Sequence, residues 1–176
     1  MRPRGSEIDN VEIHSAREID AALRETLETW FNQEFGNTGY QWAQPDWYGV
    51  VMREGEPVGR LGILERTIAI GAEAIRVGGI AGVATRPEWR NRGVASVAMR
   101  AAANFIAHEL RRPFGLLLCR HQVAPVYAKL GWETVEGPTR FMQPSGPATY
   151  RYLTMVMRFG ERSWPGGPID LCGLPW

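Results

Sequence analysis

The sequence has little cysteine, no long apolar run and no large excess of charge of one sign. Its two cysteines, Cys119 and Cys172, lack the spacing of metal ligands, so no metal site is expected, and a disulfide between them stays open. No stretch of about eighteen apolar residues occurs and no apolar segment follows the basic N-terminus, which predicts a cytoplasmic protein without a membrane span. The net charge of +1, without a basic block, argues against nucleic acid as a partner.

Two common nucleotide-binding patterns are also absent. The sequence contains neither G-x-G-x-x-G nor G-x-x-x-x-G-K-[ST], which argues against a dinucleotide-binding fold or a nucleoside triphosphatase. With 176 residues and 44% hydrophobic content, the chain is long enough for one domain with a buried core. We therefore expect a single domain over residues 1–176, with residues 160–176 as an apolar extension that folds back onto it.

The stretch from Gly78 to Ser96 combines the end of a strand, a basic turn and the start of a helix. The apolar run Ile80–Thr85 is typical of a buried strand, and Pro87 ends it because proline has no backbone N–H. The turn Arg90–Gly93 then leads into an alanine-rich segment with helical spacing. Unpaired N–H groups and the positive end of a helix dipole at such a junction favour a phosphate. The alternative is an ordinary surface turn with two solvated arginines.

Short alternating or apolar runs predict the strands of a largely antiparallel α/β (α+β) sheet. The expected strands cover residues 11–14, 48–52, 58–70, 74–85, 114–118, 132–135 and 152–159. A helix over 95–110, ended by Pro113, joins the strands 74–85 and 114–118, so these two should run parallel.

The segments outside the sheet carry further signals. Ser15 and Glu18 form a capping box that predicts the start of a helix, with apolar residues at Ile19, Leu23 and Leu27 on one face. Residues 136–147 are rich in proline and glycine and predict a long loop beside the functional site.

Between residues 32 and 47 the helical pattern breaks into aromatic and polar residues. Glu34 and Asp46 stand among Phe35, Tyr40 and Trp42. Aromatic faces and carboxylates suit a cationic ring-shaped ligand such as an aminosugar, through stacking and charged hydrogen bonds. An aromatic lid on the core is an equally weighted alternative.

The pattern Arg90-x-x-Gly93-x-Ala95 after Val83-Ala84-Thr85 resembles the acyl-CoA loop of the GCN5-related N-acetyltransferases (GNAT). The resemblance implies a mixed, mostly antiparallel sheet that is splayed at the acyl-CoA site and flanked by helices, with acetyl-CoA as cofactor. It also implies that the Val83 N–H binds the thioester carbonyl. The residues that it assigns to the cofactor are Val83, Ala84, Thr85, Arg90, Asn91, Arg92, Gly93, Val94 and Ala95.

A second match to this family is the pattern Y-x-x-x-G-aromatic at Tyr127, Gly131 and Trp132. In the family this tyrosine points at the thioester sulfur, which implies that Tyr127 protonates the leaving thiolate. A phenol, with its ordinary pKa near 10, suits that role at neutral pH. The alternative is that Tyr127 only packs. His121 follows the predicted strand 114–118 and is a candidate base, although a lone histidine is more often structural.

From Glu34 to Trp176 the chain is similar to the aminoglycoside 2'-N-acetyltransferases, through features that include Gly137-Pro138-Thr139 and a Leu-Cys…Trp end. The similarity implies an acceptor site. The residues expected there are Glu34, Asp46, Ala81, Gly82, Asp170 and Trp176. Ala81 stands where the family carries a glutamate that assists amine deprotonation, so the base stays unassigned. A branch of the family that acts on kasugamycin would accommodate this departure.

The resulting hypothesis is an N-acetyltransferase that moves acetyl from acetyl-CoA to an amino group of an aminoglycoside. A likeness of Trp164-Pro165-Gly166-Gly167 to the nodulation N-acyltransferases keeps another aminosugar open as acceptor. A non-catalytic acyl-CoA-binding module is the rival from a different class, supported by Ala81. The partner is then a small molecule, and a homodimer stays open.

Overall fold

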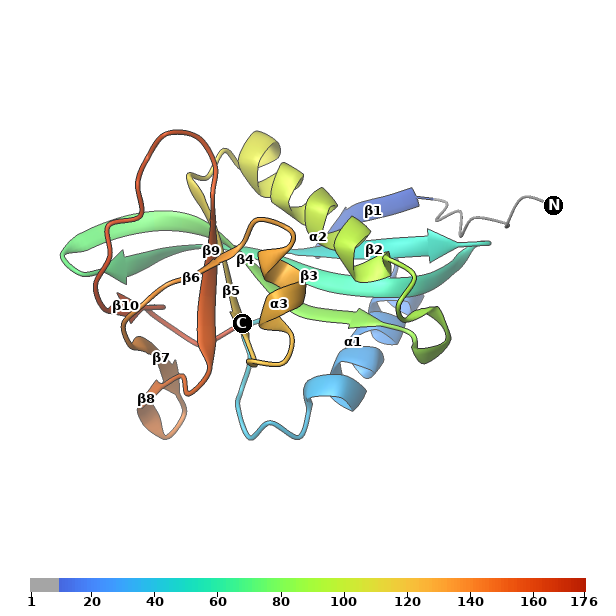
Figure 1. Ribbon diagram of the computed structural model, residues 1–176. Coiled ribbons are helices and arrows are strands. Elements are labelled where there is room, and N and C mark those ends of the chain that lie inside the picture. Colours follow the sequence, from blue (N-terminus) through green and yellow to red (C-terminus); the bar gives the residue numbers. More distant parts are fainter. Residues whose placement is uncertain (1–9) are drawn as a thin grey trace.

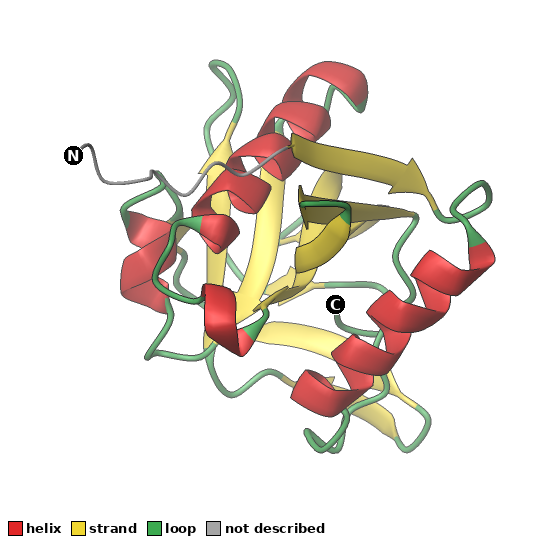
Figure 2. Ribbon diagram, turned by 90° about the vertical axis from the view of Figure 1, so that its right-hand side faces the viewer, coloured by secondary structure: helices red, strands yellow, loops and turns green. Residues whose placement is uncertain are grey.

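One curved mixed sheet runs through the computed structural model, which describes residues 10–176 (Figure 1). Within these residues the strand order is β6-β9-β5-β4-β3-β10-β7-β8. In addition, β2 pairs with β3, and β1 pairs with β2. Helices lie on the outside of the sheet (Figure 2). Residues 1–9 lie outside the described residues. They include the basic N-terminus, after which we expected no apolar segment. The predicted mixed, mostly antiparallel fold with flanking helices is confirmed.

The N-terminal half forms an antiparallel meander. Its strands are β1 (Asn10–Ser15), β2 (Trp47–Arg53), β3 (Glu56–Ile70) and β4 (Glu73–Thr85). The strands that we predicted here are confirmed. Gly55 and Gly71 adopt positive φ angles of 79° and 56° in the turns on either side of β3, which a side chain would disfavour. The long β3–β4 pair crosses the whole molecule in Figure 1.

Helix α1 (Ala21–Phe35) begins at a residue that we did not predict. Asp20 is its N-cap, and the Asp20 carboxylate accepts hydrogen bonds from the backbone N–H groups of Ala22 and Leu23, each at 3.0 Å. The expected capping box of Ser15 and Glu18 is wrong because Ser15 continues strand β1, where it pairs with Trp47. Of the predicted apolar face, Leu27 is fully buried and Leu23 is half-buried, whereas Ile19 is buried but precedes the helix.

Helix α2 connects two parallel strands. It covers Val94–Asn104 and continues as a π-helical turn, Phe105–Glu109, before β5 (Phe114–Cys119). The strands β4 and β5 pair in parallel only from Gly78 to Ile80 and from Gly115 to Leu117. A side chain at Gly78 would meet Ile106, so glycine permits the helix to approach the sheet closely. Beyond these three residue pairs, no ladder joins the ends of the two strands.

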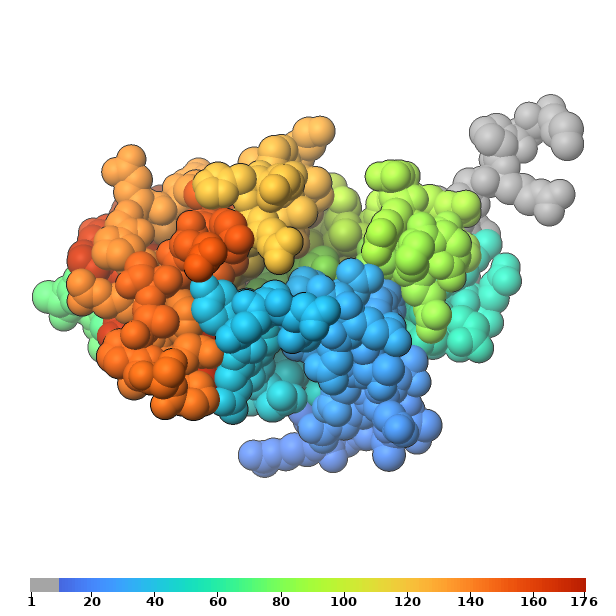
Figure 3. Space-filling model, turned by 90° about the horizontal axis from the view of Figure 1, so that it is seen from below, coloured from blue at the N-terminus to red at the C-terminus, as the bar shows by residue number. Residues whose placement is uncertain are grey.

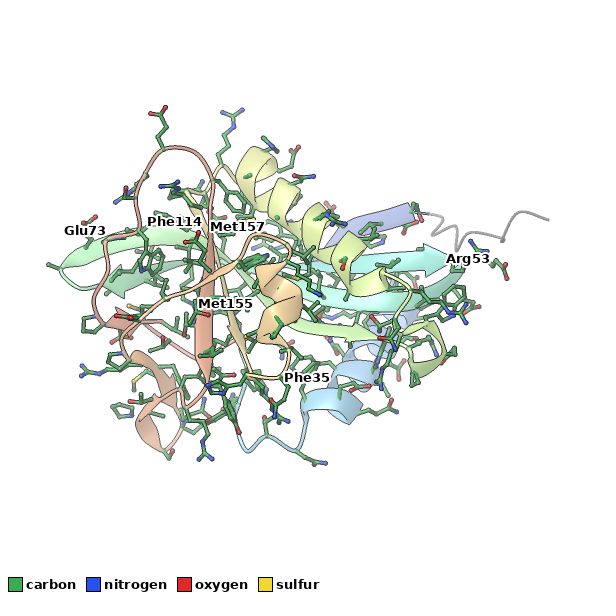
Figure 4. The ribbon with its side chains drawn as sticks, viewed as in Figure 1. Phe35, Arg53, Glu73, Phe114, Met155 and Met157 are labelled. Carbon is green, nitrogen blue, oxygen red and sulfur yellow. The ribbon has the colours of Figure 1, made fainter. Side chains whose placement is uncertain are left out.

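After β5 come α3 (Ala124–Ala128), β6 (Glu133–Thr134) and β9 (Leu153–Arg158). Strand β9 pairs antiparallel with β5 along its length. Met155 and Met157 of β9, labelled in Figure 4, belong to the same apolar cluster as α2 and Trp132. These elements match the predicted helix and strands.

The expected long loop at 136–147 is wrong. Residues 139–149 form a hairpin of β7 (Thr139–Gln143) and β8 (Gly146–Thr149). Thr139 and Phe141 are buried while Arg140 and Met142 are exposed, so the short strand has the alternation of a half-buried sheet. The proline and glycine content hid this alternation, because Pro144 belongs to the turn while Gly146, with φ 113°, and Pro147 begin an edge strand.

The C-terminal residues return to the sheet. Strand β10 (Ile169–Asp170) lies between β3 and β7, antiparallel to β3 and parallel to β7. Trp176 is only 3% exposed, and its indole N–H donates to the Leu116 carbonyl at 3.2 Å. The end of the chain is consequently at the centre of the molecule in Figure 1. Among residues 10–176, no helix combines the length and hydropathy needed to cross a bilayer.

Candidate active site

A cavity of about 800 Å³ lies where β4 and β5 separate. Its walls include residues 80–83 of β4, residues 117–119 of β5, Tyr127 of α3 and Trp176. Phe35, at the end of α1, also lines it and is labelled below α3 in Figure 4. Figure 3 shows a recess on this face between the α3 region, in yellow, and α1 with the segment that follows it.

Strand β4 carries a bulge at the cavity. Arg60 of β3 pairs with Ala84 and Gly62 pairs with Ala81, so Gly82 and Val83 together oppose the single residue Leu61. Gly82 has φ 55°, a conformation that glycine adopts without strain. Among the described strands, neither Gly82 nor Val83 has a register partner on β3 or β5. The bulge therefore presents backbone at the cavity wall.

The turn before α2 has the geometry of an anion site. Asn91 and Gly93 have positive φ angles of 60° and 80°, and Gly93 is the N-cap of α2. No atom lies within 4 Å of the place where a Cβ on Gly93 would be, so the turn is open. The Arg90 guanidinium contacts the Glu34 carboxylate at 3.2 Å, and Arg92 lies over the Trp89 ring at 5.1 Å. These residues fit a pyrophosphate at the helix N-terminus.

Thr85 ends β4, and Ala84 is buried, while Val94 and Ala95 open α2. The nine residues expected to bind the cofactor thus form one continuous junction from the bulge to the first turn of α2. Of these nine, only Val83 lines the cavity. The arrangement accommodates an extended thioester arm between the separated strands and its phosphates at the turn.

Tyr127 lies in the cavity wall and is largely shielded from water. Burial, with a smaller contribution from the nearby Cys119, raises the pKa of Tyr127 to about 12. Burial alone raises the pKa of Cys119, which also lines the cavity, to about 11. Both groups are therefore protonated at neutral pH, and the Tyr127 hydroxyl can donate a proton.

His121 does not line the cavity. Its exposed ring lies edge-on to Tyr152, with 6.3 Å between the ring centroids. The neighbouring Arg120 and Gln122 line the cavity instead.

The expected acceptor residues separate into two groups. Glu34, Ala81, Gly82 and Trp176 line the cavity. Asp46 and Asp170 do not, and each carboxylate accepts a backbone N–H nearby: Glu65 to Asp46 at 2.9 Å, and Cys172 to Asp170 at 2.8 Å. Each of these two carboxylates thus has a backbone partner outside the cavity lining.

Aromatic rings line one part of the cavity. Tyr40 packs edge-on against Trp42 at 5.5 Å, and Tyr150 packs against Tyr152 at 5.7 Å. All four line the cavity, and burial as the main cause raises the pKa of Tyr150. Tyr40 and Trp42 were expected from the sequence, whereas the two other tyrosines were missed because they follow the unpredicted hairpin.

A second, smaller cavity of about 310 Å³ adjoins the first and shares Phe31, Tyr40, Trp42, Ala81 and Trp176 with it. The sequence reading missed this cavity and its buried cation, Arg60. One signal could have revealed Arg60. It is the one charged residue in the run Pro57–Leu64 of β3, which otherwise holds apolar residues and glycines and is buried throughout.

The family described as Acetyltransferase (GNAT) domain matches residues 15–135, which is more than half of the chain. The chain therefore belongs to the GNAT acetyltransferases, which use acetyl-CoA as the acetyl donor. It is 26% identical over 129 residues to an aminoglycoside 2'-N-acetyltransferase of Mycolicibacterium fortuitum. That alignment covers 72% of this chain and 64% of the relative, so the chain spans less than two thirds of that protein.

Solved structures with the same fold include ElaA of Escherichia coli, with a TM-score of 0.63 and 14% identity over 85% of this chain and 99% of that one. Another is the GNAT family N-acetyltransferase YhbS of Escherichia coli in complex with CoA. It has a TM-score of 0.59 and 16% identity, and the match covers 93% of this chain and 89% of that one. These likenesses establish the fold.

Proposed function

We propose that the chain is an acetyl-CoA-dependent N-acetyltransferase whose acceptor is an amino group of an aminosugar compound of the aminoglycoside type. One observation carries the proposal. The separated ends of β4 and β5 open into a cavity that is lined by Val83, which has no register partner on β3 or β5, by the protonated Tyr127 and by a wall of aromatic rings. The aminoglycoside part rests on the named relative.

Different residues would bind the cofactor and take part in the reaction. The open turn at Arg90–Gly93 and the N-terminus of α2 would hold the phosphates of the cofactor. The cofactor supplies the acetyl group as a thioester. The Val83 N–H would donate a hydrogen bond to the oxygen that becomes negative when the amine attacks, which lowers the barrier most in a site shielded from water.

Tyr127 would act as the general acid. As the new carbon–nitrogen bond forms and the carbon–sulfur bond breaks, its hydroxyl donates a proton to the departing sulfur. The amine loses one proton in the same reaction, so the charges balance. Glu34 is the only acidic side chain that lines the larger cavity within the described residues, and it or a water molecule could accept that proton. His121, expected as a base, would have to turn toward the cavity from its position beside Tyr152.

The proposal is tested by thiol release from acetyl-CoA with kasugamycin, a gentamicin-type aminoglycoside and a deacetylated chitooligosaccharide as acceptors. Thiol release together with a mass gain of one acetyl group on an acceptor is expected. Clear CoA binding in calorimetry without thiol release from any acceptor would instead favour the non-catalytic acyl-CoA-binding module.

A further inference from the structure

Arg60 is a buried cation with few partners. It is 3% exposed, and its guanidinium makes one hydrogen bond, from Nη1 to the Leu27 carbonyl at 3.3 Å. Its Nε is buried without a hydrogen-bond partner. The guanidinium also lies over the Phe31 ring at 5.0 Å. No carboxylate among residues 10–176 forms an ion pair with it.

The nearest acidic side chain, Glu28, attracts this charge but forms no ion pair with it. The Glu28 carboxylate accepts hydrogen bonds from Arg24 at 2.8 Å and from the Tyr48 hydroxyl at 3.0 Å, through the same Oε1 atom. Burial lowers the pKa of Arg60 to about 10, so the guanidinium is still charged at neutral pH. A buried charge without a paired partner is costly. An anionic ligand that completed the pair would offset this cost.

The position of Arg60 connects it with the proposed reaction site. It lines the smaller cavity together with Gly62, Ala81 and Trp176, and both Ala81 and Trp176 also line the larger cavity. Its Nη2 lies 3.3 Å from the place where a Cβ on Gly82 would be, beside the bulge that presents Val83. The cation thus stands next to the backbone that would bind the thioester.

The charges of the larger cavity agree with an acceptor that is not purely cationic. Arg120 and Arg151 line it, whereas Glu34 is the only acidic side chain that lines it within the described residues. Glu34 is itself paired with Arg90. An acceptor that carries several ammonium groups and no acid would meet one acidic side chain here, which already has a cationic partner.

We propose that Arg60 binds an anionic group of the acceptor, a carboxylate or a phosphate, so that the acceptor is an aminosugar that carries an acidic group as well as its amine. This inference rests on the proposed function, because it specifies the acceptor of that reaction. The planar guanidinium suits both anions, which it can hold through two parallel hydrogen bonds.

The test compares three acceptors that share one scaffold: glucosamine, muramic acid, which adds a carboxylate, and glucosamine 6-phosphate. The kcat/KM for thiol release is measured for the wild type, for Arg60→Met and for the control Arg86→Met. Arg86 is a matched control because it also lies over an α1 ring, Trp30 at 5.4 Å, and donates to a backbone carbonyl, yet lines neither cavity.

We expect the wild type to prefer at least one acidic acceptor over glucosamine by about tenfold or more, the usual worth of a charged hydrogen bond. The acceptor that is preferred identifies the anion. Arg60→Met should abolish this preference and Arg86→Met should retain it. Equal use of the three acceptors by the wild type, or a preference that survives in Arg60→Met, would overturn the inference and leave Arg60 as a contact that holds α1 on the sheet.

Two further measurements keep the result decisive. If Arg60→Met does not fold, Arg60→Gln removes the charge but keeps a donor for the Leu27 carbonyl, and the same preference is measured. If no amine supports thiol release, the proposed function fails, and calorimetry then compares binding of the three sugars to the wild type. Tighter binding of an acidic sugar, lost in the variant, would still support the role of Arg60, and equal binding would overturn it.

Discussion

The cofactor side and the acceptor side of the cavity are built in different ways. The cofactor side is one continuous stretch, from the bulge on β4 through the turn to α2. The acceptor side joins the segment after α1, the β7–β8 hairpin and the C-terminal tail. Gln41 and Gln143 exchange two hydrogen bonds, and the backbone N–H of Ala43 donates to the Pro175 carbonyl. A site made from one stretch can be recognised in the sequence as a motif, whereas a site assembled from distant segments cannot.

The two sides also differ in how they hold positive charge. Half of the Arg90 side chain is exposed, at 53%, whereas Arg60 is 3% exposed. Solvent and salt screen an exposed charge, and burial removes most of that screening. The turn can therefore attract phosphates in competition with water, while the buried arginine needs a specific anion close to it.

Replacement of Trp176 by alanine should have the largest effect on the proposed acceptor side, on both stability and activity. Loss of a buried tryptophan costs about 3–5 kcal/mol of unfolding free energy, and Trp176 lines both cavities. Chemical denaturation should show this loss, and kinetics should show a reduced kcat/KM for the acceptor with an unchanged CoA affinity. Trp164→Ala is the matched control, because Trp164 packs on Phe114 and lines neither cavity. An equal kinetic loss in the control would contradict the assignment.

Tyr127→Phe should separate the chemistry from binding on the cofactor side. Loss of a general acid lowers turnover by about 10²-fold or more, while the affinity for CoA measured by calorimetry should stay the same. Tyr150→Phe removes a different hydroxyl from the same cavity and should lower kcat less. Unaltered turnover in Tyr127→Phe would remove its role as acid.

Gly93→Val should weaken the cofactor side alone. A branched residue at φ 80° is strained by about 1–3 kcal/mol, and its side chain would also project into the open turn, so CoA affinity should fall by roughly tenfold to a hundredfold. Gly55→Val is the matched control, since Gly55 has φ 79° and equally open surroundings but belongs to the β2–β3 turn. Intact CoA affinity in Gly93→Val would refute the pyrophosphate assignment.

The smallest effect concerns pH. Because the pKa of Tyr127 is raised to about 12, the acid form persists through the alkaline range, while a rising pH frees more of the acceptor amine for attack. The kcat/KM profile should therefore rise toward a plateau and show no decline up to about pH 10, the ordinary pKa of tyrosine. A decline near that pH in the wild type that is absent in Tyr127→Phe would show that the raised pKa does not apply during turnover.

The sequence predicted the structural features that depend on residues close together in the chain. The strands of the meander, the helix after Gly93 and the parallel pairing of β4 with β5 follow from local patterns and from the rules for crossovers. The start of α1 was wrong because Ser15 and Asp20 both suit a cap, and only the pairing of β1 with β2 decides between them. Tyr150 and Arg60 were missed because their surroundings come from distant segments.

Strand β10 has a consequence for how the chain can vary in length. Ile169 is fully buried and Asp170 is exposed, and each pairs with a neighbour on both sides. A slip of one residue would exchange these two positions and place a carboxylate in the core. Insertions and deletions should therefore be tolerated in the exposed residues 160–163, whereas the spacing from Ile169 to Trp176 is fixed by two anchors, and chimeras should exchange that segment together with β7 and β8.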